Sequence, residues 1–447
     1  MPWKYAAIVA ILFLLPCHSN LAAAEIETSD DPTNPDNVYA NVDEDYVELI
    51  QLFADTLDQV DRNYVKDIDR RELMEAAIRG VITKLDPYSN YIAPEDLERF
   101  KTGVENEFGG IGIQVSTRDG NLVVTSPLIG TPAYEAGIIA GDRITHIEGE
   151  KTEGLTIDQA VKKLKGPIGT SVTMTVYHPS TFTSEDLTVR RELVQIETVM
   201  GDERLEGGDW DFMFDHRDKI GYIRISAFSR HTADDLHKAV TKLLDDGMKG
   251  LIVDLRANPG GLLTSAVEIC DMFIDEGKIV STEGRNSPKR VWTAEKDGTL
   301  PDFPMVVLID HYSASASEIL SACLQDHDRA IIIGERSWGK GSVQNIIELE
   351  EGKSALKLTT AGYQRPSGEK IHRFEGDTEE DKWGVSPDDG MEVKMSREQK
   401  VAYHTYRRMR DQDTIIPHPP APLPELSDID PVLSKGLETL KAEISSS

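Results

Sequence analysis

Cysteine is nearly absent from this chain. Its 447 residues contain three cysteines, and Cys17 lies inside an N-terminal apolar segment, so removal of that segment would leave Cys270 and Cys323. Two cysteines make no disulfide framework of the kind that staples small secreted proteins. Both lie among apolar residues, so we expect two buried thiols, with a single bridge between them as the alternative.

Positive charge is also scarce. The chain has 48 lysines and arginines against 78 aspartates and glutamates, a formal net charge of −30. Nucleic acid and anionic lipid are bound by basic surfaces, so we expect no nucleic acid among the main partners. The histidines are dispersed and none follow a His-x-x-x-His spacing. The sequence therefore predicts neither a metal site nor a cofactor.

Long hydrophobic runs are confined to the N-terminus. Residues 5–15 are apolar after Lys4, and three alanines at 22–24 precede Glu25. This is the pattern of a cleaved secretory signal, and the run is shorter than the roughly 20 residues that span a bilayer. We predict a signal peptide at 1–24 and a periplasmic or secreted protein. An uncleaved anchor with membrane association, or a lipoprotein at Cys17, are the alternatives, and Pro16 disfavours the second.

The next two segments differ in their periodicity. Residues 25–103 hold a polar leader and then apolar positions at helical spacing, which predicts a helical N-terminal domain. Residues 104–180 hold short alternating segments, with a hairpin signal at Asp119-Gly120, a helix at 156–164 and a strand at 171–177. These features predict one compact module inserted after the helices.

Strands and helices alternate from residue 181 to 405. Apolar strands are expected at 220–225, 250–256, 305–309 and 330–333, with helices between them. Continuous apolar strands are typical of a sheet covered on both faces, so we predict a layered α/β core. The chain is thus an α/β multidomain protein. Residues 406–447 form a tail that is proline-rich at 417–424 and helical at 430–443.

Ser315 and Lys340 are the first candidates for chemistry. Ser315 stands in a small-residue turn that opens a helix, and Lys340 lies between Gly339 and Gly341 after an apolar strand. A serine hydroxyl needs a base to become nucleophilic, and burial makes lysine such a base by disfavouring its ammonium form. We predict a serine–lysine hydrolase in which Trp338 supplies an apolar wall.

Three further groups complete this hypothesis. Gln344 follows Lys340 by four residues and is a candidate orienter of its amine, and Glu318 is a candidate cap or orienter near Ser315. An oxyanion needs backbone N–H donors. Gly260 and Gly261, in a turn between a strand and a helix, and Ala316 at a helix start are the candidate donors.

The residues near Ser315 and Lys340 also allow other interpretations. Ser313 and Ser317 are read as structural hydroxyls, and His311 is an alternative base that lies only four residues before Ser315. Residues 334–340 fit the start of a phosphate-binding loop, but Gly341 stands where that motif needs serine or threonine, and no helix pattern follows. The histidine base and the phosphate-binding loop are disfavoured relative to the serine–lysine pair.

Four segments together resemble the carboxyl-terminal processing proteases of peptidase family S41. They are residues 254–262, 313–318 and 334–344, and a fourth piece at 356–361 with 366–368 and 384–388. The resemblance implies a ClpP/crotonase-like serine protease core. It also implies that Ser315 is the nucleophile, Lys340 the general base and Gln344 its orienter, with an oxyanion hole from Gly260 or Gly261 and Ala316.

The module at 104–180 resembles the PDZ domain of these enzymes. By that resemblance the loop amides at Gly109, Gly110, Ile111, Gly112 and Ile113 take a peptide carboxylate, and the strand at 112–115 pairs with the peptide. Lys165 corresponds to a basic residue that senses bound peptide. The implied partners are protein or peptide C-termini, with a homo-oligomer and an activating adaptor as further ones. An inactive PDZ peptide-binding protein and a non-peptide serine–lysine hydrolase are the alternatives.

Overall fold

The computed structural model describes residues 44–205, 208–411 and 429–446 and divides the chain into two compact units, 1–74 and 75–447. The expected signal peptide at 1–24, residues 25–43 and the proline-rich stretch at 417–424 lie outside the described residues. The first unit contains α1 (Glu44–Asn63) and the start of α2 (Arg70–Ile82). Within it, Arg70 Nε donates to Asp61 across the turn that joins the two helices, at 3.1 Å. Among the described residues, no helix combines the length and apolar content that a membrane span requires.

The second unit begins within α2 and continues the expected helical segment. The strand β1 (Asn90–Ile92) and the helix α3 (Pro94–Glu105) follow α2. Pro94 opens α3 because the first turn needs no amide donor there. β1 pairs antiparallel with β21 (Ser354–Gln364), so this early segment is bound to a late strand.

The inserted module is a sheet with its own core. Its buried side chains, including Val124, Ile144 and Val176, form a cluster separate from the main one. β2 (Glu107–Gly110) pairs with β9 (Glu192–Gln195) where the chain enters and leaves. The sheet order is β3 (Ile113–Arg118), β4 (Asn121–Pro127), β5 (Arg143–Ile147), β7 (Ser171–His178), β8 (Thr183–Arg190), with β6 (Glu150–Lys151) on β5 and the helices α4 (Pro132–Glu135) and α5 (Ile157–Leu164).

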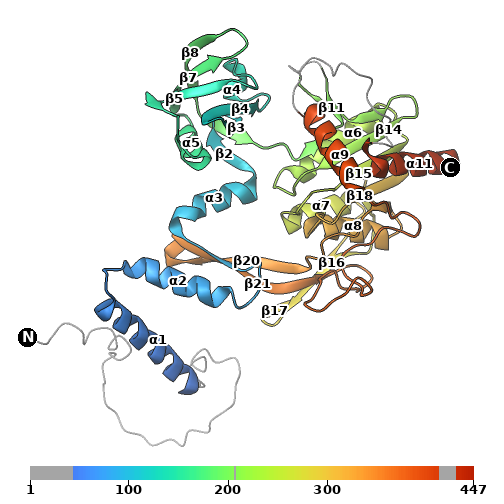
Figure 1. Cartoon of the computed structure of the whole chain (residues 1–447). Coiled ribbons are helices and arrows are strands. Elements are labelled where there is room, and N and C mark those ends of the chain that lie inside the picture. Colours follow the sequence, from blue (N-terminus) through green and yellow to red (C-terminus); the bar gives the residue numbers. More distant parts are fainter. Residues whose placement is uncertain (1–43, 206–207, 412–428, 447) are drawn as a thin grey trace, which may run out of the picture. The chain divides into compact units, whose positions relative to one another are not determined.

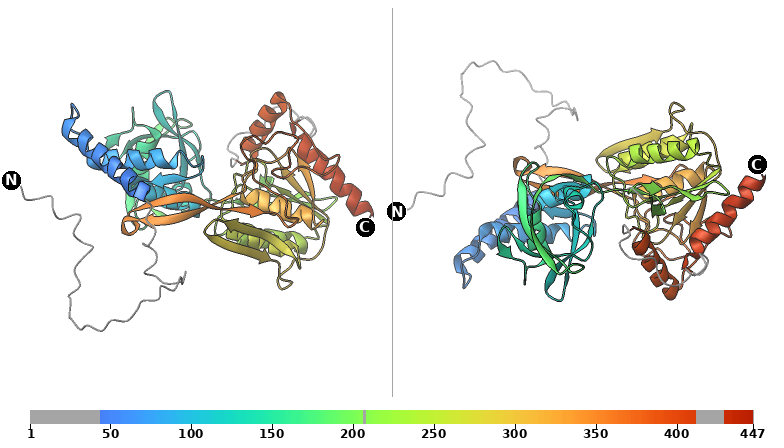
Figure 2. Two further views of the ribbon diagram at one scale, coloured as in Figure 1. Left: turned by 90° about the horizontal axis from the view of Figure 1, so that it is seen from below. Right: turned by 90° about the horizontal axis from the view of Figure 1, so that it is seen from above.

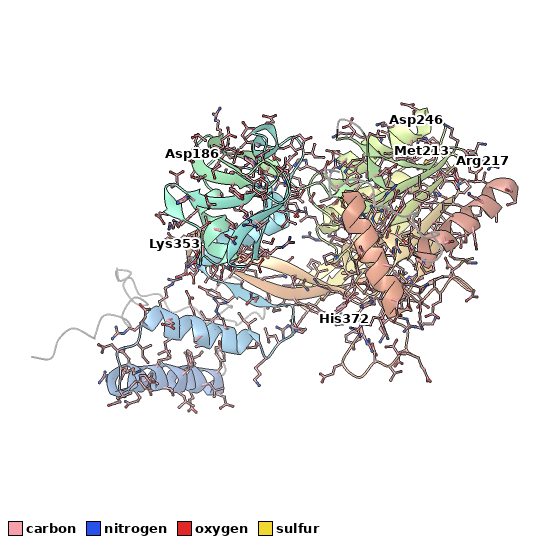
Figure 3. The ribbon with its side chains drawn as sticks, turned by 45° about the horizontal axis from the view of Figure 1, so that its top comes forward. Asp186, Met213, Arg217, Asp246, Lys353 and His372 are labelled. Carbon is pink, nitrogen blue, oxygen red and sulfur yellow. The ribbon has the colours of Figure 1, made fainter. Side chains whose placement is uncertain are left out.

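The expected hairpin at Asp119-Gly120 joins β3 to β4. The same sheet continues beyond residue 180, because β8 pairs with β7 along its whole length, from Thr183 to Arg190. Figure 3 labels Asp186 on β8, where Asp186 Oδ1 accepts a hydrogen bond from Thr175.

A second sheet is the centre of the core (Figure 1). Its main strands are parallel and follow the expected alternation with helices: β14 (Ile220–Ile225), β15 (Gly250–Asp254), β18 (Met305–Ile309) and β19 (Ile331–Gly334). The connecting helices are α6 (Thr232–Asp245), α7 (Leu263–Phe273) and α8 (Ala316–Asp326). Two short strands, β10 (Val199–Met200) and β13 (Met213–Asp215), pair antiparallel with β14.

Both faces of this sheet are covered, as the apolar strands predict (Figure 2). Residues such as Val253 and Val307 pack with α6, α7 and α8 on one face. Ile252 and Leu308, on the alternate positions, pack with Leu433 of α11 (Pro431–Ser446) on the other. Because successive side chains of a strand point to opposite faces, each strand contributes to two apolar cores.

A buried ion pair fixes α11 to the sheet. The guanidinium of Arg256, just after β15, donates to both carboxylate oxygens of Asp430 at 2.7 and 2.8 Å, and to Asp254 at 2.6 Å. All three side chains are buried. Bidentate geometry with satisfied partners offsets the cost of burying these charges, so the segment before α11 is held in one register.

The third sheet supports the candidate active site. Its strand order is β1-β21-β16 (Lys278–Gly284)-β17 (Ser287–Thr293), and β20 (Ser342–Leu349) pairs with β21 as a long hairpin. Figure 3 labels Lys353 at the turn of this hairpin. The two remaining cysteines, Cys270 on α7 and Cys323 on α8, are buried and free, as expected of two thiols in an apolar core.

Candidate active site

Ser315 is the N-cap of α8 and has an unusual backbone. Its φ of 57° and ψ of −114° lie in a region that side chains with a Cβ rarely adopt. The loop is held there by Ser313 Oγ, which donates to the carbonyl of Leu255 at 2.9 Å, and by Ser317 Oγ, which donates to that of Asn258 at 3.0 Å. The hydroxyls of the two flanking serines therefore stabilise the loop, which is the structural role expected from the sequence.

Glu318 joins the serine loop to the lysine loop. Its side chain is fully buried, and its Oε2 accepts hydrogen bonds from the amides of Ser315 and Lys340, both at 2.8 Å. Its Oε1 accepts from the amide of Gly339 and from Ser337 Oγ, each at 2.6 Å. Two amide nitrogens that share one oxygen lie no more than about twice a hydrogen-bond length apart. The backbones of Ser315 and Lys340 are therefore neighbours.

Lys340 lies in a half-buried position that disfavours its charge. Burial lowers the pKa of its amine, the positive charge of Lys357 lowers it further, and the carboxylate of Glu318 opposes both. The aromatic ring beside the amine is that of Tyr88, with its centroid 5.2 Å from Nζ. Trp338, expected to be the apolar wall, is 48% exposed, and its indole N–H donates to the Tyr88 hydroxyl at 3.4 Å.

The glycines around Lys340 are required by close packing. A Cβ on Gly341 would lie 2.4 Å from the backbone nitrogen of His372 (Figure 3), and one on Gly339 would lie 2.8 Å from the Arg373 side chain. Gly339 also has a φ of 86°. The loop can therefore pass between its neighbours only without side chains at these two positions.

The side chains of Ser315 and Lys340 make no direct bond to one another in the described structure. Among the described residues, no hydrogen bond joins Ser315 Oγ to Lys340 Nζ. Ser315 interacts instead with the hydroxyl of Tyr363, which also donates to the Lys340 carbonyl. Burial raises the pKa of Tyr363 well above its usual value, so this hydroxyl stays protonated.

Gln344 lies on β20 beside β21. Its Nε2 donates to Ser342 Oγ at 2.9 Å, to the Ser342 carbonyl at 3.1 Å and to Thr359 Oγ1 at 3.3 Å. In the described part of the chain, no hydrogen bond joins Gln344 to Lys340. The amide nitrogen is thus bonded to Ser342 and Thr359, and the Thr359 hydroxyl in turn donates to Asp86.

The candidate oxyanion donors meet at the nucleophile. A Cβ on Gly260 would lie 2.8 Å from both Ser315 Cβ and the Ala316 nitrogen, so this glycine touches the serine turn. The Gly260 amide donates to Asn258 Oδ1 at 2.8 Å. The amides of Gly261 and Ala316 have no hydrogen-bond acceptor within the described ranges. Gly261 and Ala316 are therefore the pair left open for a ligand oxygen.

The candidate peptide-binding loop lies between β2 and β3. Gly109 and Gly110 end β2, and Ile113 begins β3. Gly112 has a φ of 77°, and a Cβ there would lie 2.3 Å from Thr131. Its carbonyl accepts hydrogen bonds from Leu128 and Thr131, while the amides of Ile111 and Gly112 find no acceptor in the described structure. The loop therefore presents free N–H groups, the arrangement that binds a carboxylate.

Lys165 is the C-cap of α5, next to this loop. Its amine lies 4.1 Å from the ring centroid of Phe108, and burial lowers its pKa. The guanidinium of Arg191 donates to the carbonyls of Leu164 and Lys163 at 2.9 and 2.8 Å, which satisfies the end of the helix and fixes the position of Lys165. No carboxylate partner of Lys165 is found among the described residues.

Sequence reasoning missed four residues of this site. Tyr363, Thr359 and Tyr88 contact the candidate catalytic groups, and Asp86 accepts a hydrogen bond from Thr359. These residues come from β21 and from the turn after α2. His311, the alternative base, has its Nδ1 3.8 Å from Glu335 Oε2.

The family models that match the chain cover all three of its expected parts. Residues 219–388 match peptidase family S41, residues 123–177 match the PDZ domain, and residues 17–96 match the N-terminal domain of the activating protease CtpB. The fold class expected from the sequence is confirmed: an α/β multidomain protein with a helical N-terminal segment, a PDZ module and a layered protease core.

Curated relatives agree with these matches. A carboxy-terminal-processing protease of Bartonella bacilliformis is 38% identical over 79% of this chain and 77% of its own length. The carboxy-terminal processing protease CtpA of Bacillus subtilis is 36% identical over 71% of this chain and 65% of its own length. A solved structure of a photosystem II D1 C-terminal processing protease is 28% identical, covers 77% of this chain and 92% of its own, and has a TM-score of 0.43. The chain therefore belongs to peptidase family S41 and is a serine-type, carboxy-terminal processing peptidase with a PDZ domain.

Proposed function

We propose that this enzyme cleaves its substrates with a serine–lysine dyad. Ser315 is the nucleophile, Lys340 the general base and Gln344 the group that orients the lysine amine. The observation that carries the proposal is the buried Glu318 carboxylate, which binds the amides of both Ser315 and Lys340. The lowered pKa of Lys340 supports it as well, because only the neutral amine can accept a proton.

The reaction is acyl transfer in two steps. Lys340 takes the hydroxyl proton of Ser315 while Oγ forms a bond to the scissile carbonyl carbon, and the carbonyl oxygen becomes an oxyanion. The amides of Ala316 and Gly261 stabilise that charge, since the Gly260 amide already donates to Asn258. The C–N bond then breaks, and the leaving amine receives the proton from Lys340. Water, deprotonated by Lys340, hydrolyses the acyl-enzyme and releases a carboxylate product with Ser315 restored.

The rise of kcat/KM on the acid side of the pH–rate profile (its acid limb) tests the role of Lys340 as general base. We expect kcat/KM to rise with pH through the pKa of Lys340, since the neutral amine is the active form. Lys357→Gln removes a positive charge that lowers this pKa, so it should move the limb to higher pH. Lys353→Gln, at the turn of the same hairpin, is the control and should leave the limb in place. A limb that moves to lower pH in the Lys357 variant contradicts the assignment.

We also propose that the PDZ module captures the substrate by its C-terminus. The loop at Gly109, Gly110, Ile111, Gly112 and Ile113 binds the terminal carboxylate, and β3 pairs with the residues before it. The open amides of Ile111 and Gly112 support this. Lys165 is close to the loop and has no carboxylate partner within the described part of the chain, so it adds a positive charge that favours an anionic terminus.

Peptides that differ only at their last group test the capture step. We expect a peptide with an apolar, free C-terminus to be cleaved about tenfold or more faster, in kcat/KM, than its C-terminal amide, because the amide lacks the charge that the loop binds. Mass spectrometry of the products measures both rates with the full mature chain. Equal rates would remove PDZ capture from the proposal.

Two lysine variants test whether Lys165 contributes to the preference for a free C-terminus. Lys165→Ala should reduce the preference for the free carboxylate, whereas Lys163→Ala should not, because the Lys163 amine pairs with Glu150 on the exposed side of α5. Loss of the preference in both variants would point to a general charge effect rather than to Lys165.

The proposed processing of the chain follows from its N-terminus. We propose that residues 1–24 are a cleaved signal peptide and that the mature enzyme acts in the periplasm or outside the cell. Its substrates are the C-terminal tails of proteins in that compartment. The boundaries proposed from the sequence after the signal are 25–103, 104–180, 181–405 and 406–447 for the N-terminal helices, the PDZ module, the protease core and the tail. Because β8 belongs to the sheet of the PDZ module, that module extends at least to Arg190.

A further inference from the structure

The turn at residues 86–89 lies against the candidate active site. It follows α2 and leads into β1, which pairs with β21. Tyr88 places its ring beside the Lys340 amine, and its hydroxyl accepts from the Trp338 indole. The turn thus contacts the lysine loop on one side and β21 on the other, although nothing in the proposed mechanism uses it.

Asp86 is the acceptor around which this turn is built. Its carboxylate accepts from the amides of Tyr88 at 2.7 Å and Ser89 at 2.8 Å, and from Ser89 Oγ at 2.8 Å. A fourth bond comes from Thr359 Oγ1 at 3.3 Å. These hydrogen bonds outweigh the effect of burial and lower the pKa of Asp86, so the group is an anion near neutral pH.

The hydrogen bonds that run from Gln344 through Thr359 to Asp86 determine the orientation of the Gln344 amide. An ionised carboxylate only accepts hydrogen bonds, so Thr359 must give its single hydroxyl proton to Asp86. The Thr359 oxygen can then only accept from Gln344, and it does so from Nε2 at 3.3 Å. With the nitrogen of the amide turned to Thr359 and Ser342, its carbonyl oxygen is left for another donor.

We propose that Asp86, acting through Thr359, is a positioning element that sets the amide orientation of Gln344 so that its oxygen is available to the Lys340 amine. This inference rests on the proposed function, in which Gln344 orients the lysine. If the amide were reversed, its NH₂ group would face the amine and would donate to the lone pair that must accept the Ser315 proton. The Asp86–Thr359 pair therefore acts together with the Ser342 carbonyl against the unproductive orientation.

Two replacements of Thr359 test the proposal. Thr359→Val keeps the shape of the side chain but removes the hydroxyl, and we expect kcat to fall about tenfold or more while KM changes less than about twofold. Thr359→Ser keeps the hydroxyl and should restore most of kcat. Fluorescein-labelled β-casein, digested by the full mature chain, serves as substrate for both.

The neighbouring residue supplies a matched control. Thr360 Oγ1 is buried and has no hydrogen-bond partner among the residues that the structure describes. Thr360→Val therefore removes a hydroxyl from the same strand that is not part of the Gln344–Thr359–Asp86 hydrogen bonds. We expect it to keep wild-type kcat. A Thr359→Val enzyme as active as Thr360→Val would overturn the proposal.

A double-mutant cycle separates positioning from a merely structural effect. If Thr359 acts through Gln344, then Thr359→Val should cost almost nothing in an enzyme that already carries Gln344→Ala. Costs that multiply in the double variant would instead mean independent roles and refute the inference. Ser315→Ala distinguishes the two levels of argument: a casein-cleaving Ser315→Ala enzyme defeats the proposed function, whereas an inert one with a fully active Thr359→Val defeats the positioning role alone.

Discussion

Ser315→Ala is expected to abolish peptide cleavage, a loss of about four orders of magnitude or more, while the fold and peptide binding persist. Without the hydroxyl no acyl-enzyme can form, and water attack assisted by the oxyanion donors alone is far slower. The measurement compares single-turnover product formation with peptide affinity in the same preparation. Lys340 should behave in the same way when it is replaced.

Lys340→Arg tests the need for a neutral amine more specifically than Lys340→Ala does. Arginine keeps a long cationic side chain but cannot lose its proton at accessible pH, so it should be as inactive as alanine at this position. Restored turnover in the arginine variant would show that the charge, and not a neutral amine, is what the reaction needs. Either variant turning over substrate at the wild-type rate would end the dyad assignment.

The strained backbone of Ser315 also predicts an effect on the free energy of unfolding. A residue with a Cβ held at φ 57° and ψ −114° costs about 1–3 kcal/mol relative to an unstrained backbone. Ser315→Gly should therefore be inactive yet more stable than Ser315→Ala, by about 1 kcal/mol in urea unfolding. The strain is the local consequence of pointing this side chain out of the turn.

Glu318→Gln is expected to reduce kcat/KM by at least about a hundredfold. A carboxamide has one acceptor oxygen, but each oxygen of Glu318 accepts from two donors. In either orientation the NH₂ end would face two donors, so the loop of Ser315 and that of Lys340 would lose their common acceptor. Each buried donor left unpaired costs about 1–3 kcal/mol, partly offset because a buried negative charge is removed.

Ser337→Ala is the graded control for this prediction. It removes the hydroxyl donor to Oε1 and leaves three backbone amides on the Glu318 carboxylate. We expect a loss of about tenfold or less. If Glu318→Gln were no worse than Ser337→Ala, the carboxylate would be a helix cap and nothing more, and the link between the two loops would need another explanation.

Local signals in the sequence predicted much of the fold. The hairpin at Asp119-Gly120 formed because those residues accept the turn geometry, and the apolar strands from Ile220 onwards became the parallel sheet. The start of α8 and the glycines on either side of Lys340 were also visible, since each reflects a rule about one short segment.

Contacts between distant segments could not be read in this way. Nothing in the composition of residues 86–89 indicates that they meet β21, and Tyr363 looks like any aromatic residue of a strand. Trp338 seemed the natural wall for Lys340 because it is adjacent in sequence, yet Tyr88 supplies the ring. Glu318 was recognisable as a cap, whereas its second role depends on a loop that follows 21 residues later.

The bond between Ser89 and Thr359 joins positions 270 residues apart. Because a protein is synthesised from its N-terminus, the turn that contacts the lysine loop is made long before the strand with which it interacts. Pairings of such long range also form slowly. The contact between the turn at 86–89 and β21 can therefore form only after residue 359 has been synthesised.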